Sequence, residues 1–161
     1  MKSVCFTGHR HICNEEQLQN RLIETLESLI SNGVTDFYAG GAIGFDTLAA
    51  NVVLLLREKY SHIKLHLILP CCKFDQTAKW TTEQIAEYDR ILSAADSAEY
   101  ICEKYYYGCM KARNARLVEL ADCCVCYYDN KNSASGTGQT VRMAERKGIT
   151  VFNTFEKETH L

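Results

Sequence analysis

The sequence is short of proline, of net charge and of long apolar segments. Pro70 is the only proline among 161 residues, and 18 basic residues face 20 acidic ones for a formal net charge of −2. Without a cationic excess, nucleic acid is not the default partner. The longest apolar run, near residues 48–56, is too short to cross a bilayer and favours a buried helix face. The first ten residues, MKSVCFTGHR, lack a signal-peptide pattern, so we expect a cytoplasmic protein with no membrane contact.

Several motifs that would assign a function are also missing. The sequence has no G-x-G-x-x-G fingerprint after its first strand, no G-x4-G-K-[ST] and no G-x-S-x-G. These absences disfavour ordinary NAD binding, a Walker-type NTPase and an α/β-hydrolase. The nine cysteines include Cys123 and Cys126 at C-x2-C spacing, but no second pair follows. We therefore expect buried thiols, no metal site and no cofactor.

What is present is a regular alternation of strand and helix patterns. Short β-rich runs occur six times, and helical periodicities separate them. The expected strands are 3–7, 35–39, 64–69, 97–102, 122–128 and 149–153, and the expected helices are 15–32, 45–60, 81–95, 109–121 and 138–147. This order predicts an α/β fold, a Rossmann-like three-layer sandwich with a mostly parallel sheet of about six strands. We expect one domain over residues 1–161, with a polar tail from about residue 155.

Two glycine-rich loops follow expected strands. YAGGAIGFD places Gly40, Gly41 and Gly44 before Asp46 and a helix, and SGTGQT (135–140) leads into another helix. Glycines let backbone amides approach a ligand, and a helix N-terminus attracts anions, so both loops predict phosphate binding. Ligands of such sheets bind at the carboxyl ends of the strands. Two simpler interpretations stay open: the glycines make only a tight turn, and Asp46 caps its helix rather than holding a ribose hydroxyl.

Five segments together carry a resemblance to a known family. CFTGHR, GGAIGFDTLAA, PCCKFDQTAKW, CMKARN and SGTGQTVRMAERKG resemble the YpsA/YoqJ-like family of the SLOG superfamily, which also holds the Smf/DprA and LOG proteins. The likeness spans about residues 3–153 and implies a Rossmann-like fold with a nucleotide pocket. The expected ligand-binding residues, from the loops and the resemblance together, are Gly8, His9, Arg10, Gly40, Gly41, Gly44, Asp46, Arg113, Asn114, Ser135, Gly136, Thr137, Gly138 and Thr140.

The resemblance implies three functions. The first is binding of a nucleotide or nucleotide-derived ligand, as in a sensor. The second is a LOG-like phosphoribohydrolase, but Thr140 stands where LOG enzymes carry a catalytic glutamate, so a non-standard carboxylate (Asp46, Asp129 or Glu145) has to replace it. The third, second-rank for a chain of net negative charge, is DprA-like binding of single-stranded DNA. Related folds often form homodimers, and a homodimer is a further expectation.

Overall fold

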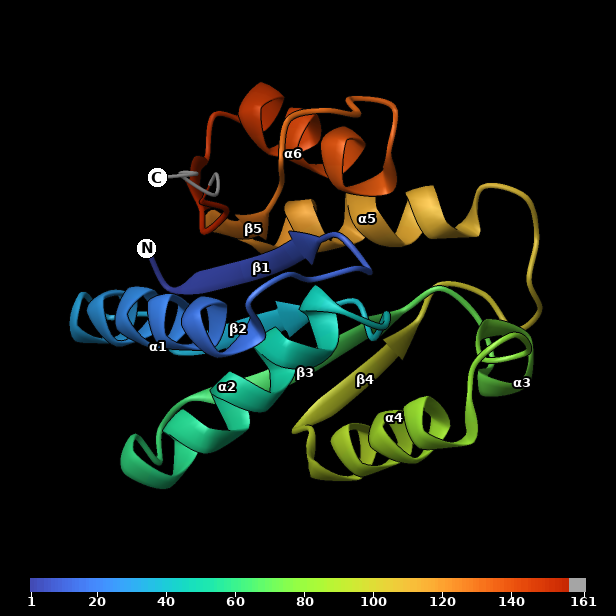
Figure 1. Cartoon of the computed structure of the whole chain (residues 1–161), viewed down its shortest axis with the longest axis horizontal. Coiled ribbons are helices and arrows are strands. Elements are labelled where there is room, and N and C mark those ends of the chain that lie inside the picture. The colour runs from blue at the N-terminus through green and yellow to red at the C-terminus, as the bar shows by residue number, and fades with distance from the viewer. Residues whose placement is uncertain (157–161) are drawn as a thin grey trace.

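The fold expected from the sequence is confirmed. The computed structural model describes residues 1–156, which form an α/β fold with one all-parallel six-stranded sheet (Figure 1). The strands are β1 (Ser3–Gly8), β2 (Asp36–Ala39), β3 (Lys64–Leu69), β4 (Ser97–Tyr100), β5 (Cys123–Tyr127) and β6 (Thr150–Asn153). The helices are α1 (Glu15–Ser31), α2 (Phe45–Lys59), α3 (Lys73–Gln76), α4 (Thr82–Ala94), α5 (Cys109–Leu120) and α6 (Gly136–Lys147). Most of the expected polar tail, residues 157–161, lies outside the described residues.

Helices cover both faces of the sheet. α1, α2 and α4 pack on one face, over a core that includes Phe6, Phe37 and Val125, while α5 and α6 cover the other. In strand β5 all five residues are buried, and its three cysteines pack as small apolar side chains, as the sequence predicts. No helix within residues 1–156 is long and apolar enough to span a membrane.

The strand order places a switch point, where consecutive connections leave in opposite directions, between β1 and β5. The order is β4-β3-β2-β1-β5-β6, so the chain moves outward from β1 in one direction and later returns to build β5 and β6 on the other side. β1 and β5 are neighbours, with Gly8 paired to Tyr127 at their carboxyl ends. The helices that follow these two strands lie on opposite faces. Such a switch point leaves a crevice at the carboxyl edge, where ligands of this sheet type bind.

The element boundaries depart from expectation in two places. The structure adds the one-turn helix α3, which follows Pro70 and was not predicted, because four residues are too few to show a helical period. Helix α6 begins at Gly136, two residues before the expected 138, because the Ser135 hydroxyl accepts a hydrogen bond from Gly138 N at 3.0 Å and caps it. Helix α4 begins with a capping box, in which Thr81 and Gln84 bond reciprocally.

Candidate functional site

The first glycine loop turns sharply between β2 and α2. Gly41 and Gly44 have φ values of +70° and +79°, which side-chain-bearing residues rarely adopt. A Cβ on Gly44 would overlap the carbonyl of Arg10, so the loop after β1 packs directly on the glycine loop. Gly8 is equally confined, because a Cβ there would overlap the Phe45 ring. Positive φ values and close packing therefore account for Gly8, Gly41 and Gly44 before any ligand is considered.

Gly40 is required for a different reason. Its φ is not positive, but a Cβ on Gly40 would overlap the Arg113 guanidinium and lie 2.8 Å from Asp46 Oδ2. The Arg113 side chain donates from Nη1 to the Gly40 carbonyl oxygen, across 73 residues of sequence, and from Nε to Asn114 Oδ1 at 2.8 Å. Helix α5 thus places a buried cation under the glycine loop, and only glycine leaves room for it.

Asp46 and Arg113 are the buried charges of this edge. Asp46 is 6% exposed and Arg113 is 5% exposed, yet within residues 1–156 neither side chain forms an ion pair. Burial raises the pKa of Asp46, and the attraction of Arg113 and a hydrogen bond from Ala42 N only partly oppose that rise. Burial likewise lowers the pKa of Arg113, against the attraction of Asp46. An arginine still stays charged near neutral pH, so the loop rests on a permanent positive charge.

The sequence leaves open whether Asp46 caps α2 or holds a ribose hydroxyl, and its position in the helix partly decides between the two. The N-cap residue of this helix is Gly44, and no side chain caps it. Asp46 lies in the first turn, where its Oδ2 accepts a hydrogen bond from Ala42 N at 3.3 Å. Its carboxylate therefore closes the glycine loop rather than capping the helix. A role toward a ribose hydroxyl stays a prediction.

The second glycine-rich loop lies beside the same helix α5. A Cβ on Gly136 would be 3.7 Å from Asn114 Nδ2. Neighbouring residues of α5 therefore face the two loops, Arg113 the first and Asn114 the second. Thr137 is 7% exposed at the start of α6, while Thr140 is fully buried and donates its hydroxyl to Gly136 O at 2.8 Å. Gly138 packs against the carbonyls of Asn132 and Ser133, which a Cβ would approach within 3 Å.

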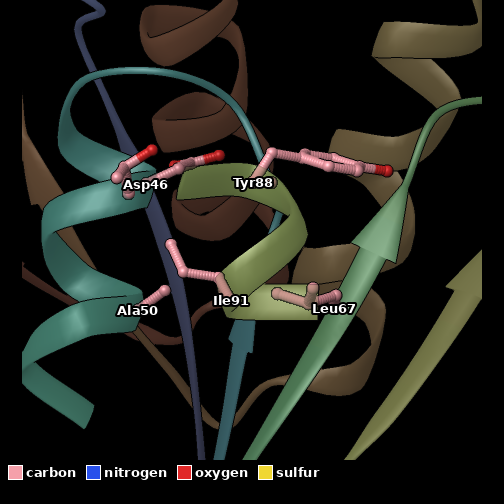
Figure 2. Close-up of a pocket in the computed structure, with 7 residues that line it drawn as sticks. Asp46, Ala50, Leu67, Tyr88 and Ile91 are labelled. Carbon is pink, nitrogen blue, oxygen red and sulfur yellow. The ribbon is translucent and has the colours of Figure 1, made fainter. Parts of the chain in front are cut away.

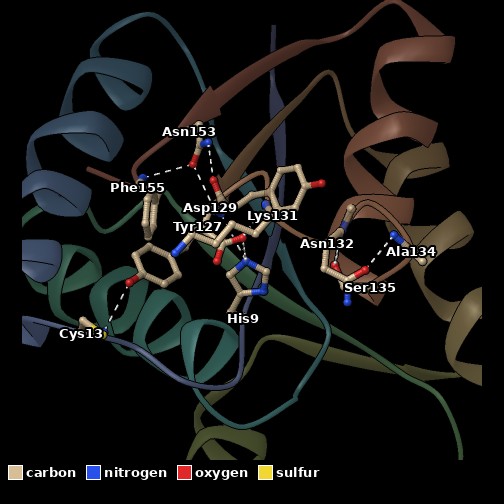
Figure 3. Close-up of polar contacts among 12 residues, drawn as sticks. His9, Cys13, Tyr127, Asp129, Lys131, Asn132, Ala134, Ser135, Asn153 and Phe155 are labelled. Atoms are coloured by element: carbon tan, nitrogen blue, oxygen red, sulfur yellow. Dashed lines mark hydrogen bonds and ion pairs between the residues drawn. The ribbon is translucent and has the colours of Figure 1, made fainter. Parts of the chain in front are cut away.

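His9 and Arg10 of the TGHR segment have different surroundings. His9 Nε2 lies 3.1 Å from Asp129 Oδ1 and 3.2 Å from Asp129 N, so it joins the loops after β1 and β5 across the switch point (Figure 3). Hydrogen bonding from Lys131 N and the nearby His9 lower the pKa of Asp129. Arg10 is exposed, and its guanidinium has no partner within the described chain. It is nevertheless near enough to Asp46 and Arg113 to affect the pKa of each.

A small cavity lies directly under the glycine loop (Figure 2). Its lining residues come from α2, α4, β3 and the loop itself: Gly41, Asp46, Thr47, Ala50, Leu67, Tyr88 and Ile91. The space open to the centre of a water molecule is about 10 Å³, enough for about one water and too little for a nucleotide. Tyr88 is 5% exposed, its hydroxyl has no hydrogen-bond partner among residues 1–156, and its ring points that hydroxyl away from Asp46 (Figure 2).

Sequence reasoning missed two residues of this edge, Gln76 and Tyr88, and named a third, Asp129, only as a replacement carboxylate. Gln76 of α3 donates from Nε2 to Gly41 O at 3.1 Å, and its buried Oε1 has no partner within the described part of the chain. Tyr88 reaches the cavity from α4. Gln76 lies in the segment after β3, which the sequence analysis used only for the family resemblance, and Tyr88 lies inside α4, where no positional signal marks it. Asp129 directly follows the expected strand 122–128, and this position is the signal that could have placed it at the carboxyl edge.

Comparisons with known proteins agree with this architecture. The family model described as the YspA SLOG family matches residues 6–154. A UPF0398 protein of Halalkalibacterium halodurans is 31% identical over 67% of this chain, and the match spans 57% of that relative's length. The uncharacterised prophage-derived protein YoqJ of Bacillus subtilis is 28% identical over 81% of each chain.

Two solved structures share the fold. DNA processing protein A of Helicobacter pylori, described for its single-stranded DNA binding, has a TM-score of 0.64 and 23% identity, with 94% of this chain and 64% of that one covered. The X-ray structure of TM1055 has a TM-score of 0.59 and 18% identity, with 94% and 72% covered. At these identities the likeness extends to the fold alone. Because the family model covers nearly all of the described residues, the chain belongs to the YspA SLOG family.

Proposed function

We propose that this protein binds a nucleotide or nucleotide-derived ligand through its phosphate at the edge formed by the two glycine-rich loops. The observation that carries the proposal is the Arg10 guanidinium, which is exposed and has no partner in the described chain, while its charge affects the pKa of both Asp46 and Arg113. An arginine is suited to bidentate recognition of phosphate. The first turns of α2 and α6 add N–H groups without intrahelical acceptors, although Phe45 N already donates to His9 O and Gly138 N to Ser135 Oγ.

The buried residues of the site serve as its support. Arg113 fixes the glycine loop through Gly40, and Gln76 holds the same loop through Gly41. A loop held on both sides keeps its amides in one arrangement, which lowers the entropic cost of binding. The ligand phosphate would contact the amides and Arg10, and Asn114 or Asp46 would contact a sugar hydroxyl or base edge.

The test is a thermal-shift screen against nucleoside mono-, di- and triphosphates, nucleotide sugars and dinucleotides. A ligand at about one hundred times its Kd stabilises a protein by about 2.7 kcal/mol, which corresponds to roughly 5 to 11 °C for a chain of this size. Arg10→Ala removes a charged hydrogen bond worth about 1.5–3 kcal/mol and should weaken binding at least about tenfold. Arg146→Ala, an exposed arginine in the last turn of α6, is the matched control.

Two results would contradict the proposal. If no nucleotide shifts the melting temperature, the loops serve only as tight turns. If Arg10→Ala leaves the ligand-induced shift as large as in the Arg146→Ala control, the phosphate binds elsewhere. Because Arg10 is exposed, its loss should change the melting temperature of the free protein little.

A second candidate function is hydrolysis of a nucleotide glycosidic bond. One observation favours it: burial raises the pKa of Asp46, and a carboxyl group that holds its proton more firmly is suited to protonate a leaving base. Thr140, at the position of the LOG glutamate, is buried with its hydroxyl bonded inside α6. The assay is release of free base from nucleoside monophosphates. Release that persists in Asp46→Asn would rule out this role for Asp46.

A further inference from the structure

Three polar side chains are bonded in a line across β2, β3 and β4. His66 Nδ1 lies 2.7 Å from Ser97 Oγ, and His66 Nε2 lies 2.8 Å from Asp36 Oδ1. The parallel pairing brings them together, because His66 is in register with Ser97 on one side and with Tyr38, two residues after Asp36, on the other. Asp36 and Ser97 begin their strands, whereas the glycine-rich loops follow strand ends. The order serine, histidine, aspartate is that of an activated serine nucleophile.

The surroundings of His66 hold its ring in one orientation. The Tyr38 ring stacks on it, with 4.8 Å between ring centroids and 24° between their planes. The far oxygen of the Asp36 carboxylate is also held, because Thr35 Oγ1 donates to Oδ2 at 2.6 Å. The His66 side chain is only 16% exposed. A general base needs this kind of fixed position within hydrogen-bond reach of the proton that it removes.

The contacts of His66 also fix where its proton lies. Burial raises the pKa of Asp36, but hydrogen bonds from Thr35 and His66 outweigh that effect and leave the pKa below its ordinary value of 3.8. The carboxylate is therefore charged near neutral pH and only accepts hydrogen bonds. In neutral His66 the proton then belongs on Nε2, which donates to Asp36, and Nδ1 carries the lone pair. The Ser97 hydroxyl donates to that lone pair.

Ser97 is open to solvent at the side of the sheet. Its side chain is exposed, and β4 is the last strand of the sheet on that side (Figure 1). An edge strand presents N–H groups that have no acceptor in a neighbouring strand. Backbone N–H groups beside a nucleophile are suited to stabilise the oxyanion that forms when the nucleophile attacks a carbonyl. A reactant can thus approach the serine hydroxyl directly.

We propose that Ser97 is the nucleophile of an acyl-transfer site for carboxylic esters, with His66 as its general base and Asp36 as a positioning residue. Ser97 Oγ attacks the ester carbonyl carbon and gives its proton to His66 Nδ1. The bond from that carbon to the alcohol oxygen then breaks, and the departing oxygen takes the proton. Water attacks the acyl-serine in the same way, which releases the acid and restores Ser97. This site goes beyond the nucleotide site proposed above and does not depend on it.

The first test is labelling of the full chain with a fluorophosphonate probe, read by intact mass and peptide mapping. The wild type should gain one adduct, on Ser97, and Ser97→Ala should gain none. Ser61→Ala, an exposed serine in the turn before β3, is the matched control and should label like the wild type. His66→Gln should slow labelling at least about a hundredfold, because a general base contributes about 10²–10⁴ in rate.

The second test is hydrolysis of p-nitrophenyl acetate, which separates the role of Asp36 from a structural one. Asp36→Asn should lower kcat about tenfold or more with little change in KM, because the amide no longer fixes the tautomer of His66. Asp36→Glu keeps a carboxylate and should recover part of the lost rate. An equal loss in both variants would contradict the positioning role.

Two results would overturn the proposal as a whole. The first is absence of a Ser97 adduct together with ester hydrolysis no faster than that of Ser97→Ala, because the three side chains would then only tie the strands together. The second is labelling of Ser97 at the same rate in His66→Gln as in the wild type. Since Ser97 is exposed, its replacement should leave the fold intact. Arg10→Ala should not change labelling, so this site and the nucleotide site succeed or fail separately.

Discussion

Replacing Gly40 with alanine tests whether a buried arginine, rather than backbone conformation, requires glycine in the first loop. The added Cβ would overlap the Arg113 guanidinium and force it away from the Gly40 carbonyl. Overpacking costs about 1–3 kcal/mol, and loss of a hydrogen bond from a charged group costs about 1.5–3 kcal/mol. We expect a loss of about 3 kcal/mol in the free energy of unfolding. For a chain of this length the melting temperature should fall by about 6 to 12 °C.

The matched control is Gly136→Ala. Gly136 also lies at the carboxyl edge without a positive φ, but its added Cβ would meet only Asn114 Nδ2 at an ordinary 3.7 Å. This change should be neutral or stabilise by about 0.4–1 kcal/mol, because alanine restricts the unfolded chain. Urea unfolding of both variants gives the comparison in free energy.

The cause is isolated by a double-mutant cycle. In an Arg113→Ala background the guanidinium is gone, and Asp46 Oδ2 has room to move away from the new Cβ. Gly40→Ala should then cost at least about 2 kcal/mol less than in the wild type, which is a coupling typical of side chains in contact. Equal costs in the two backgrounds would refute the reasoning, since the glycine would then be needed for its backbone alone.

Three further perturbations follow from other parts of the structure. Thr81→Ala removes the capping box of α4 and should destabilise by about 1 kcal/mol in urea unfolding, whereas Thr82→Ala should cost less. Hydrogen bonding, first from Arg90, lowers the pKa of Glu87 from 4.5 to about 2, so its stabilisation is present above pH 4.5 and is lost as the pH falls toward 2. The stability deficit of Glu87→Gln should accordingly disappear over that range, and a constant deficit would contradict it. Cys13 is the exposed thiol of the described chain, so Cys13→Ser should remove the fastest phase of labelling by a thiol reagent in the native protein.

The sequence alone determined the elements and their order. Period-2 and period-3.6 patterns are local properties of the chain, and glycines and caps mark their ends, so five helices and all six strands could be placed. The same reasoning located both glycine-rich loops, because parallel strands bring every loop that follows a strand to one edge. The short helix α3 escaped prediction because one turn shows no period.

Only the tertiary structure decided what each glycine is for. Nothing near Gly40 in the sequence indicates that Arg113, 73 residues away, occupies the space a side chain would need. Likewise, His9 and Asp129 meet across 120 residues only because β1 and β5 are neighbours. The physical reason is that local patterns fix which face of an element is buried, whereas strand order and close packing fix which residue it meets there.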